Sequence, residues 1–318
     1  AVAFVGTLCA PAPAGLDPQA WVLFAVYITA ILGIMLRPQV EPVVILVVIS
    51  VSTFFVPIGT LLSGFANATA WMVFSAFLIS QAFADTGLGQ RIACHLNRRF
   101  GKTTLGLAYA AALTDLAISP ATPSNTARTG GIVYPIFRSV ASALGSEPGP
   151  TARRFGAYLT LTMYQISLTT AGLFITACAP NILTVNFAKD IFGIEISWMT
   201  WMQAAIVPGL VVLAAVPYIV YKIYPPEIKH NENAQSVADE KLREMGPVTG
   251  KEKLLVLFFL LAVAGWATSS ITKVNNTAIA FLFFSACVVF KLLSWETVLK
   301  NKGAWSTFVW YAGIIGIS

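Results

Sequence analysis

Long apolar runs, separated by short polar stretches, fill most of this chain. A helix needs about 17 to 25 mostly apolar residues to cross the hydrocarbon core of a membrane, and several of the runs reach or approach that length. The pattern therefore predicts an all-α, polytopic membrane protein. The predicted helical runs occupy residues 1–10, 20–36, 43–56, 70–84, 103–119, 155–179, 201–224, 254–268, 277–293 and 304–318.

Two further apolar runs, at residues 130–140 and 182–188, are too short to span a membrane. The first follows a polar, proline-containing stretch at 119–126, and the second follows Pro180-Asn181. An unpaired backbone group costs several kcal/mol in lipid, so irregular backbone persists there only where protein buries it or water reaches it. We therefore expect two discontinuous helices, the device by which transporters present helix ends to a solute.

The positions of the basic residues indicate how the chain is threaded. Cytoplasmic loops of membrane proteins are rich in Lys and Arg. All of the 20 basic residues except Arg128, Lys189 and Lys273 fall in loops that one side of the membrane could share. That arrangement holds only if the segment 103–140 enters and leaves on the same side. The segment is therefore predicted to be a re-entrant helical hairpin, with the polar stretch at its tip.

Composition agrees with a membrane protein and narrows its partners. Hydrophobic residues make up 57% of the chain and charged residues only 11%, whereas a soluble domain carries about 25% charged residues. The net charge of +6 follows membrane topology, so we expect the lipid bilayer, and no nucleic acid, as a partner. The four cysteines are scattered and both histidines lie in polar loops. Neither pattern predicts a metal cluster.

The polar stretch 225–253 is interpreted as a linker between two halves.

Two features are typical of a membrane surface. Residues 91–102 mix basic and apolar side chains, which favours a short amphipathic helix on the anionic inner leaflet; the alternative is a plain basic loop. Five tryptophans near segment ends are predicted to form interfacial belts: Trp21, Trp71, Trp198, Trp201 and Trp305.

An internal echo suggests duplication. The sequence Ala70-Trp-Met-Val-Phe74 is answered by Ala304-Trp-Ser-Thr-Phe308. If residue 304 opens the second copy of the helix at 70, a second hairpin with a second polar tip is expected beyond residue 318. The C-terminal part is then expected to be missing. Because the chain starts without Met inside an apolar stretch, an N-terminal truncation is expected as well.

The hairpin tip carries the candidate chemistry. A helix N-terminus offers free N–H groups and a positive partial charge of about half an elementary unit, which suits an anion such as a dicarboxylate. Ser124 or Asn125 would cap the helix that runs from 127 toward 140, with Pro123 fixing its entry. The Asn125 amide and the Thr126 hydroxyl would then donate to a carboxylate, and Gly130-Gly131 would let another backbone approach closely. The alternative is a buried cap without a ligand.

Arg128 and Asp115 would lie at membrane depth, where charge is expensive and usually functional. Arg128 is either a countercharge for the anion or a partner of Asp115, and Asp115 either balances Arg128 or binds a cation. Asn181 is either packing glue between helices or a ligand at the second break. The predicted substrate-binding residues are Thr122, Ser124, Asn125, Thr126, Arg128, Gly130, Pro180 and Asn181.

The motif at 119–131 (Ser-Pro-Ala-Thr-Pro-Ser-Asn-Thr-Ala-Arg-Thr-Gly-Gly) resembles the first signature of the divalent anion:sodium symporter (DASS) family. The chain is more similar to the citrate/succinate antiporter and 2-oxoglutarate/malate translocator branch. Shorter supporting matches are Gly15-Leu-Asp-Pro-Gln-Ala-Trp21, Leu62-Ser-Gly-Phe65, Thr86-Gly-Leu-Gly-Gln-Arg91, Gly101-Lys-Thr-Thr-Leu-Gly-Leu-Ala-Tyr109, Phe174-Ile-Thr-Ala-Cys-Ala-Pro-Asn181 and Lys302-Gly-Ala-Trp305.

This resemblance implies an inverted-repeat transporter in which each repeat has a scaffold part and a transport part. It also implies a homodimer through the scaffold and an elevator-like movement of the transport part. The domains are then first-repeat scaffold helices at 1–84, an interfacial amphipathic helix at 85–102, the transport-domain hairpin and broken helix at 103–200, a closing membrane helix at 201–224, a cytoplasmic linker at 225–253 and the start of a truncated second repeat at 254–318.

The resemblance also implies a sodium site at the tip and at the second break, for which Ser124 and Asn125 are weak candidates. The chain departs from the sodium-coupled pattern in two places. Pro120 stands where those symporters typically have a serine, and 177–181 reads Ala-Cys-Ala-Pro-Asn in place of a Gly-Ser/Thr-Pro-Pro-Asn run. Fewer oxygen ligands favour dicarboxylate exchange without sodium.

The predicted function is thus exchange of di- or tricarboxylates against a counter-substrate, without a cofactor other than a possible sodium ion, in a bacterial inner membrane. A sodium-coupled symporter of the same fold is the alternative. An intramembrane enzyme is a remote third, because Asp115 and Arg128 are the only obvious ionisable residues within the spans. Which carboxylate is carried stays open.

Overall fold

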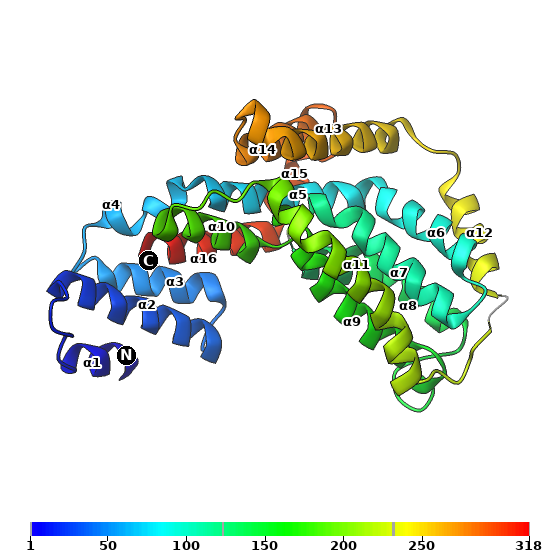
Figure 1. The fold of residues 1–318 in the computed structure, drawn as a ribbon, viewed down its shortest axis with the longest axis horizontal. Helices are drawn as coiled ribbons and strands as arrows, with labels where there is room; N and C mark the ends of the chain where they lie inside the picture. Colours follow the sequence, from blue (N-terminus) through cyan, green and yellow to red (C-terminus); the bar gives the residue numbers. More distant parts are fainter. Residues whose placement is uncertain (1, 123, 231–232, 318) are drawn as a thin grey trace. The chain divides into compact units, whose positions relative to one another are not determined.

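The computed structural model describes residues 2–122, 124–230 and 233–317, and within these ranges every regular element is a helix (Figure 1). Four of the described helices are long and apolar enough to cross a membrane: α2 (Pro18–Leu36), α5 (Ala68–Thr86), α11 (Trp198–Ile223) and α13 (Gly250–Thr272). Shorter apolar helices are α3 (Glu41–Ser52) and α14 (Asn276–Val289). The prediction of an all-α, multi-pass membrane protein is confirmed.

The helices form two compact units, Ala1–Ser75 with Glu296–Ser318 and Ala76–Trp295. The finer domain boundaries drawn from the sequence stay predictions. In the first unit, α1 (Val2–Cys9) packs on α2, and α16 (Lys302–Ile317) packs against α2, α3, α4 (Ile58–Leu61) and the 3-10 helix η1 (Ser63–Ala66). The core of this unit contains Val26, Ala30, Ile45, Ile49, Leu61 and Ile317.

The two copies of the echoed sequence meet inside the first unit. The ring of Trp71 lies 4.6 Å from that of Phe308, and the ring of Phe74 lies 4.7 Å from that of Trp305. Each indole N–H also donates to a carbonyl shortly before its own helix, Trp71 to Phe65 and Trp305 to Val298. Such reciprocal contacts are expected between elements related by a two-fold axis. They support the internal repeat, which stays a prediction.

Glycines let α16 approach its neighbours at backbone distance. A Cβ on Gly64 would overlap the carbonyl oxygen of Ala312, and a Cβ on Gly316 would overlap that of Leu61. Small residues allow this close approach of helices in membrane proteins. Because the atoms in the way belong to the backbone, they cannot rotate aside as a side chain would.

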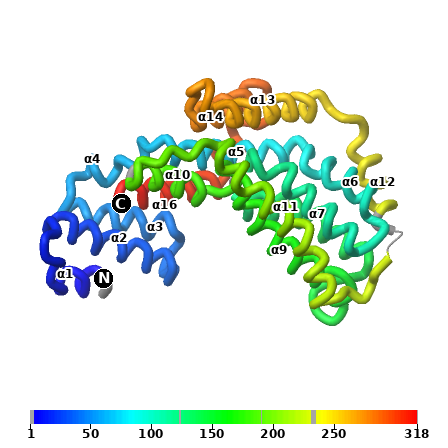
Figure 2. Tube along the Cα trace, in the orientation of Figure 1, coloured from blue at the N-terminus to red at the C-terminus, as the bar shows by residue number. Residues whose placement is uncertain are grey.

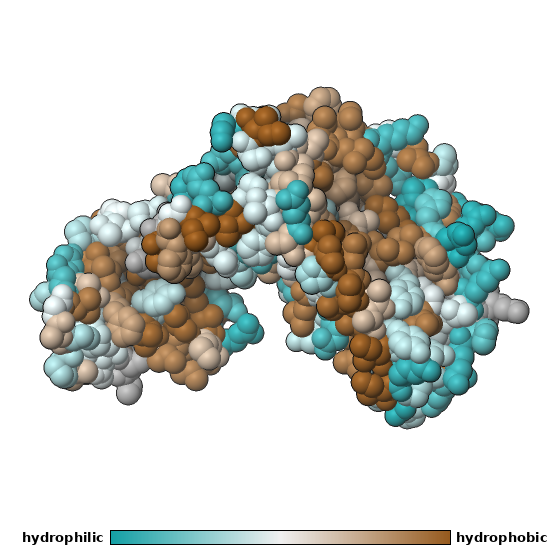
Figure 3. All heavy atoms as spheres, in the orientation of Figure 1, coloured by the Kyte–Doolittle hydropathy of each residue, from teal (hydrophilic) through white to brown (hydrophobic). Residues whose placement is uncertain are grey.

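The second unit holds both predicted helix breaks. Its helices α7 (Thr104–Ile118), α9 (Gly156–Leu173) and α11 lie side by side, with α8 (Tyr134–Ala143) against α9 (Figure 2). The core between them includes Leu107, Ala111, Phe137, Tyr158 and Met163. On α11 many exposed side chains are apolar, among them Val207, Val211, Ile219 and Ile223, and hydrophobic surface appears over this region in Figure 3. These surfaces suit contact with lipid or with other apolar helices.

The basic stretch predicted to be amphipathic is the helix α6 (Leu88–Phe100), so the alternative of a plain basic loop is wrong. Leu88, Ala93 and Cys94 are buried, and the helix packs on α7. Its apolar face therefore contacts protein. Its location at the membrane surface stays a prediction.

The stretch interpreted as a linker is more ordered than expected. It contains α12 (Asn233–Met245), which packs on α6, and α13 already begins within it, at Gly250. The buried guanidinium of Arg91 joins α6 to this region through its Nε, 2.6 Å from Oε1 of Glu252, and its Nη1, 3.0 Å from the Gly246 carbonyl oxygen. The sequence analysis interpreted this region as a linker because its charges are mixed, although its Ala, Glu, Lys and Leu residues all favour helix formation.

Replacing Gly64 by Ala should destabilise the first unit. The added methyl group meets the Ala312 backbone, and overpacking of this kind costs about 1–3 kcal/mol. Thermal unfolding of the full-length protein in detergent would measure the change. Gly59→Ala is the matched control, because a Cβ there meets nothing within 4 Å. Equal unfolding temperatures for the two variants would contradict the packing described.

Candidate functional site

The first break forms the tip of a helical hairpin. The inward arm is α7 followed by the 3-10 helix η2 (Ser119–Ala121), and the outward arm is the π-helix η3 (Thr126–Val133) followed by α8. The arms contact each other, since Asp115 on α7 reaches both Arg128 and Thr129 on η3. The predicted hairpin with a polar break is confirmed. Its entry from the basic side of the membrane stays a prediction.

The outward arm begins with wide turns that sequence analysis did not anticipate. A helix running from 127 toward 140 was expected, whereas the chain is π-helical up to Val133 and α-helical only from Tyr134. Pro135 accounts for the transition, because it has no N–H to donate and its ring clashes with the carbonyl four residues earlier. Such π segments are frequent at functional sites.

The second break separates α9 from α10 (Ala179–Phe192), with the 3-10 helix η5 (Ile175–Ala177) between them. Pro180 lies exposed in the first turn of α10. The side-chain amide of Asn181 donates at 2.7 Å to the carbonyl oxygen of Ala171, in the last turn of α9, and at 3.0 Å to that of Phe174, which also accepts from the Ala177 N–H. Of the two alternatives for Asn181, the packing role is therefore present.

Trp198 also supports the second break. It is 2% exposed, its ring stacks on Phe174, and its indole N–H donates to the Thr176 hydroxyl at 3.1 Å. The prediction that Trp198 belongs to an interfacial belt is therefore wrong, because its position near a segment end coincides with a buried contact.

The two breaks lie together, since η2 packs against η5. Arg128 joins them. Its Nη1 donates to the Thr122 carbonyl oxygen at 2.8 Å on one break and to the Ala177 carbonyl oxygen at 3.3 Å on the other. Its Nε lies 3.1 Å from Oδ2 of Asp115, and its Nη2 donates to the Thr170 hydroxyl at 2.9 Å. We call these five residues, together with Thr129, the Arg128 network.

Hydroxyl groups complete the pairing of the carboxylate in this network. Thr170 donates its hydroxyl proton to Oδ2 of Asp115, and Thr129 donates to Oδ1 at 2.7 Å. The side chains of Arg128 and Asp115 are 0% and 1% exposed. Removing one partner of such a buried pair costs about 3–5 kcal/mol, because the other charge is left uncompensated.

Burial separates the predicted site residues into two groups. Thr122 and Arg128 face inward: the Thr122 hydroxyl donates to the Ile118 carbonyl oxygen, and neither side chain has exposed surface. The pairing of Arg128 with Asp115 is thus present, while direct contact of Arg128 or Thr122 with an anion has no open route in this conformation. The broken backbone itself uses their donors, and their assignment as substrate contacts stays a prediction.

The remaining residues of the tip face outward. Ser124 caps the outward arm, with its hydroxyl accepting from the Ala127 N–H at 3.2 Å, so of the two expected caps Ser124 is the one observed. Asn125 is half-buried and Thr126 exposed, and the side chain of neither has a hydrogen-bond partner within the described ranges. Pro123 lies outside the described residues. The tip therefore presents uncharged donors.

The expected role of the glycine pair is not seen. A Cβ on Gly130 or Gly131 would meet nothing within 4 Å, so no other described backbone approaches them. Both glycines are exposed on the π-helix. The prediction of a close backbone contact is wrong for the part of the chain described, whereas the approach of a ligand to Gly130 stays a prediction.

The described residues offer no cluster of three or more His, Cys, Asp or Glu side chains for a metal ion. A sodium ion would instead need hydroxyl, amide and carbonyl oxygens. The Ser124 hydroxyl oxygen already accepts from the backbone as a cap, so Ser124 and Asn125 as sodium ligands stay a prediction. Neutral donors at a helix N-terminus are well suited to hold a carboxylate.

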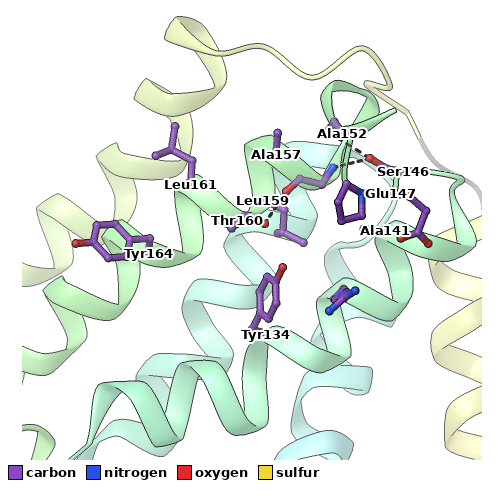
Figure 4. A pocket seen from close by; sticks show the side chains of 13 residues that line it. Tyr134, Ala141, Ser146, Glu147, Ala152, Ala157, Leu159, Thr160, Leu161 and Tyr164 are labelled. Atoms are coloured by element: carbon purple, nitrogen blue, oxygen red, sulfur yellow. Dashed lines mark hydrogen bonds between the residues drawn. The ribbon is translucent and has the colours of Figure 1, made fainter. Parts of the chain in front are cut away.

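A separate pocket of about 520 Å³ lies between α8, α9 and the loop that joins them (Figure 4). Tyr134 comes from α8, Ser146 and Glu147 from the loop, and Leu159 and Tyr164 from α9. Its walls are largely apolar and include no residue of 119–126. We assign no chemistry to it.

Sequence reasoning missed Thr129 and Thr170. Thr170 sits in an apolar helix and is 55 residues from Asp115 in the chain. No local pattern distinguishes it from the neighbouring Thr169, which donates to the Gln165 carbonyl oxygen of its own helix. Only the folded arrangement of α7 and α9 identifies it.

Comparison with known proteins places the chain among transporters. The family described as "Sodium:sulfate symporter transmembrane region" matches residues 1–318. The inner membrane protein YbhI of Escherichia coli strain K12 is 46% identical over 318 residues, covering 97% of this chain and 66% of the relative. The chloroplastic dicarboxylate transporter 2 of Spinacia oleracea is 38% identical over 315 residues (97% and 55%), and the citrate/succinate antiporter of Escherichia coli strain K12 is 34% identical over 328 residues (96% and 67%). The chain thus spans between about half and two thirds of these relatives.

Replacing Asn181 by Ala should lower the stability of the second break. The carbonyl group of Ala171 would lose its side-chain donor, while that of Phe174 would keep only the Ala177 N–H. An unsatisfied buried group costs about 1–3 kcal/mol. Thermal unfolding in detergent would measure the loss. The exposed Thr184→Ala in the same helix is the control. Loss of ligand binding at an unchanged unfolding temperature would assign Asn181 to the ligand instead.

Proposed function

Because the chain belongs to the sodium:sulfate symporter family of membrane transporters, we propose that it is part of a secondary transporter of di- and tricarboxylates. The substrate class follows the names of two relatives, a dicarboxylate transporter and a citrate/succinate antiporter. The location we propose, a bacterial inner membrane, follows the name of a third. The activity belongs to the whole protein, of which this chain spans a part.

The observation that carries this proposal is the chemistry of the hairpin tip. Asn125 and Thr126 have side-chain donors without partners among the described residues, directly at the N-terminal end of the outward arm. The one cation of the break, Arg128, is neutralised by Asp115. A carboxylate would therefore be held by the Asn125 amide, the Thr126 hydroxyl and the positive end of the helix. Ser124 supports them as the cap.

We propose that transport is an exchange of carboxylates without sodium. Two features support this choice over symport: Pro120 offers no side-chain oxygen, and the Ser124 hydroxyl is occupied as a cap. The second candidate, sodium-coupled symport, is favoured by the description of the family as sodium:sulfate symporters. From the resemblance to the family we also propose a homodimer and an elevator-type movement.

Asn125→Ala should abolish dicarboxylate uptake by the full-length protein in proteoliposomes, because a donor to the carboxylate is lost. Loss of a hydrogen bond to a charged group costs about 1.5–3 kcal/mol, which is at least a tenfold loss of affinity. Expression and unfolding temperature should not change, since the side chain has no hydrogen-bond partner among the described residues.

The matched control for Asn125→Ala is Gln165→Ala. Gln165 is also a neutral amide in the second unit, but it lies exposed on α9, away from both breaks. Uptake should stay at the wild-type level. If Asn125→Ala transports as well as this control does, the tip is not the substrate site.

Counterflow should separate exchange from symport. Proteoliposomes of the full-length protein would be loaded with unlabelled succinate, malate, citrate or 2-oxoglutarate, and entry of labelled succinate measured with and without sodium. We expect entry only into loaded vesicles and no effect of sodium, because the chain lacks two oxygen donors of the sodium-coupled pattern. Sodium-dependent entry into empty vesicles would establish symport.

A further inference from the structure

The side chain of Arg128 hydrogen-bonds to the backbones of both helix breaks. The Thr122 carbonyl follows η2 and the Ala177 carbonyl ends η5, and both accept from the same nitrogen, Nη1. Carbonyl groups at the ends of helical segments carry negative partial charge. One guanidinium therefore holds the two breaks together. Arg128 and Ala177 are 49 residues apart in the chain.

The other nitrogens of Arg128 are fixed as firmly. Nε pairs with Asp115 on α7, and Nη2 donates to Thr170 on α9, which in turn donates to Asp115. The orientation of the planar guanidinium is thus set from three directions. A lysine could keep the charge but could not span these acceptors, because its ammonium is a single point.

The backbone of Arg128 belongs to the turn that carries the outward-facing donors. Its N–H donates to the Ser124 carbonyl oxygen at 2.9 Å, so Asn125 and Thr126 lie within the same turn. At the other end, Ala177 is followed directly by Cys178 and the first turn of α10. The guanidinium therefore sets the distance between the tip donors and the N-terminus of α10.

We propose that Arg128 is a positioning residue for substrate binding. Through the Arg128 network it fixes the position of the hairpin tip relative to the start of α10, so that the side-chain donors of the tip and the positive end of α10 face one carboxylate substrate. This inference rests on the proposed function. Arg128 itself does not touch the substrate, and its loss acts by misplacing groups that do. A misplacement of about 1 Å can cost on the order of a hundredfold in rate.

The test compares KM with maximal rate in carboxylate exchange by the full-length protein in proteoliposomes. A role in stability alone would reduce the amount of active protein, which lowers the maximal rate and leaves KM unchanged. Positioning predicts a higher KM. It also predicts a changed ratio of KM for succinate to KM for the longer 2-oxoglutarate, because the spacing between the two ends changes.

Two variants remove the network in different ways. Arg128→Lys keeps the charge beside Asp115 and loses the fork, and KM should rise about tenfold or more. Thr170→Val keeps the shape and loses the hydroxyl between Arg128 and Asp115, and KM should rise about threefold or more. If Arg128→Lys fails to fold, the Thr170 variant alone decides.

The controls are Thr170→Ser, which keeps the hydroxyl, and Thr169→Val, which removes a hydroxyl bonded only within α9. Both should keep KM within about twofold of the wild type. Unchanged KM and an unchanged substrate ratio in Arg128→Lys and Thr170→Val would overturn the inference while leaving the proposed function intact. A wild-type protein that exchanges no carboxylate would overturn both.

Discussion

The buried pair of Arg128 and Asp115 is the constraint on which this arrangement depends. Broken helices release carbonyl groups that lipid cannot satisfy, and a buried guanidinium has five donors that need acceptors. The two requirements are met together, because Arg128 donates hydrogen bonds to the carbonyl groups of Thr122 and Ala177 at the breaks. Asp115 then removes the net charge. All four residues are fully buried, so the ion pair and the carbonyl groups of the breaks satisfy one another out of contact with water.

Charged and uncharged side chains at the tip therefore have different roles. Charged groups hold the backbone from inside, and uncharged groups, Asn125 and Thr126, face outward. A neutral site with oriented dipoles binds an anion without the high desolvation penalty that a free arginine would bring. It also releases the anion more readily than a full countercharge would. Both properties suit the carboxylate transporter proposed above.

Sequence analysis located the breaks because proline occurs together with small polar residues within apolar runs at 119–126 and 180–181, a combination that disfavours a continuous helix. It identified Ser124 as a possible cap and Asp115 as a possible partner of Arg128. It could not locate the π-helical turns, the place of Thr170 or the burial of Trp198, since each depends on packing between distant segments. The helix α12 was missed for a related reason. Its charged sequence is typical of a linker, and only its packing against α6 shows that it is an ordered helix.

Every residue of the Arg128 network, and both breaks, belong to the single compact unit Ala76–Trp295. A transport cycle that moved such a unit as a body would leave these hydrogen bonds intact, so the geometry of the site would be the same at both membrane surfaces. Movement would then have to break contacts other than those that shape the site. The polar bonds are concentrated within this unit, and apolar surface such as that of α11 lies on its outside, as the proposed elevator-type movement would require.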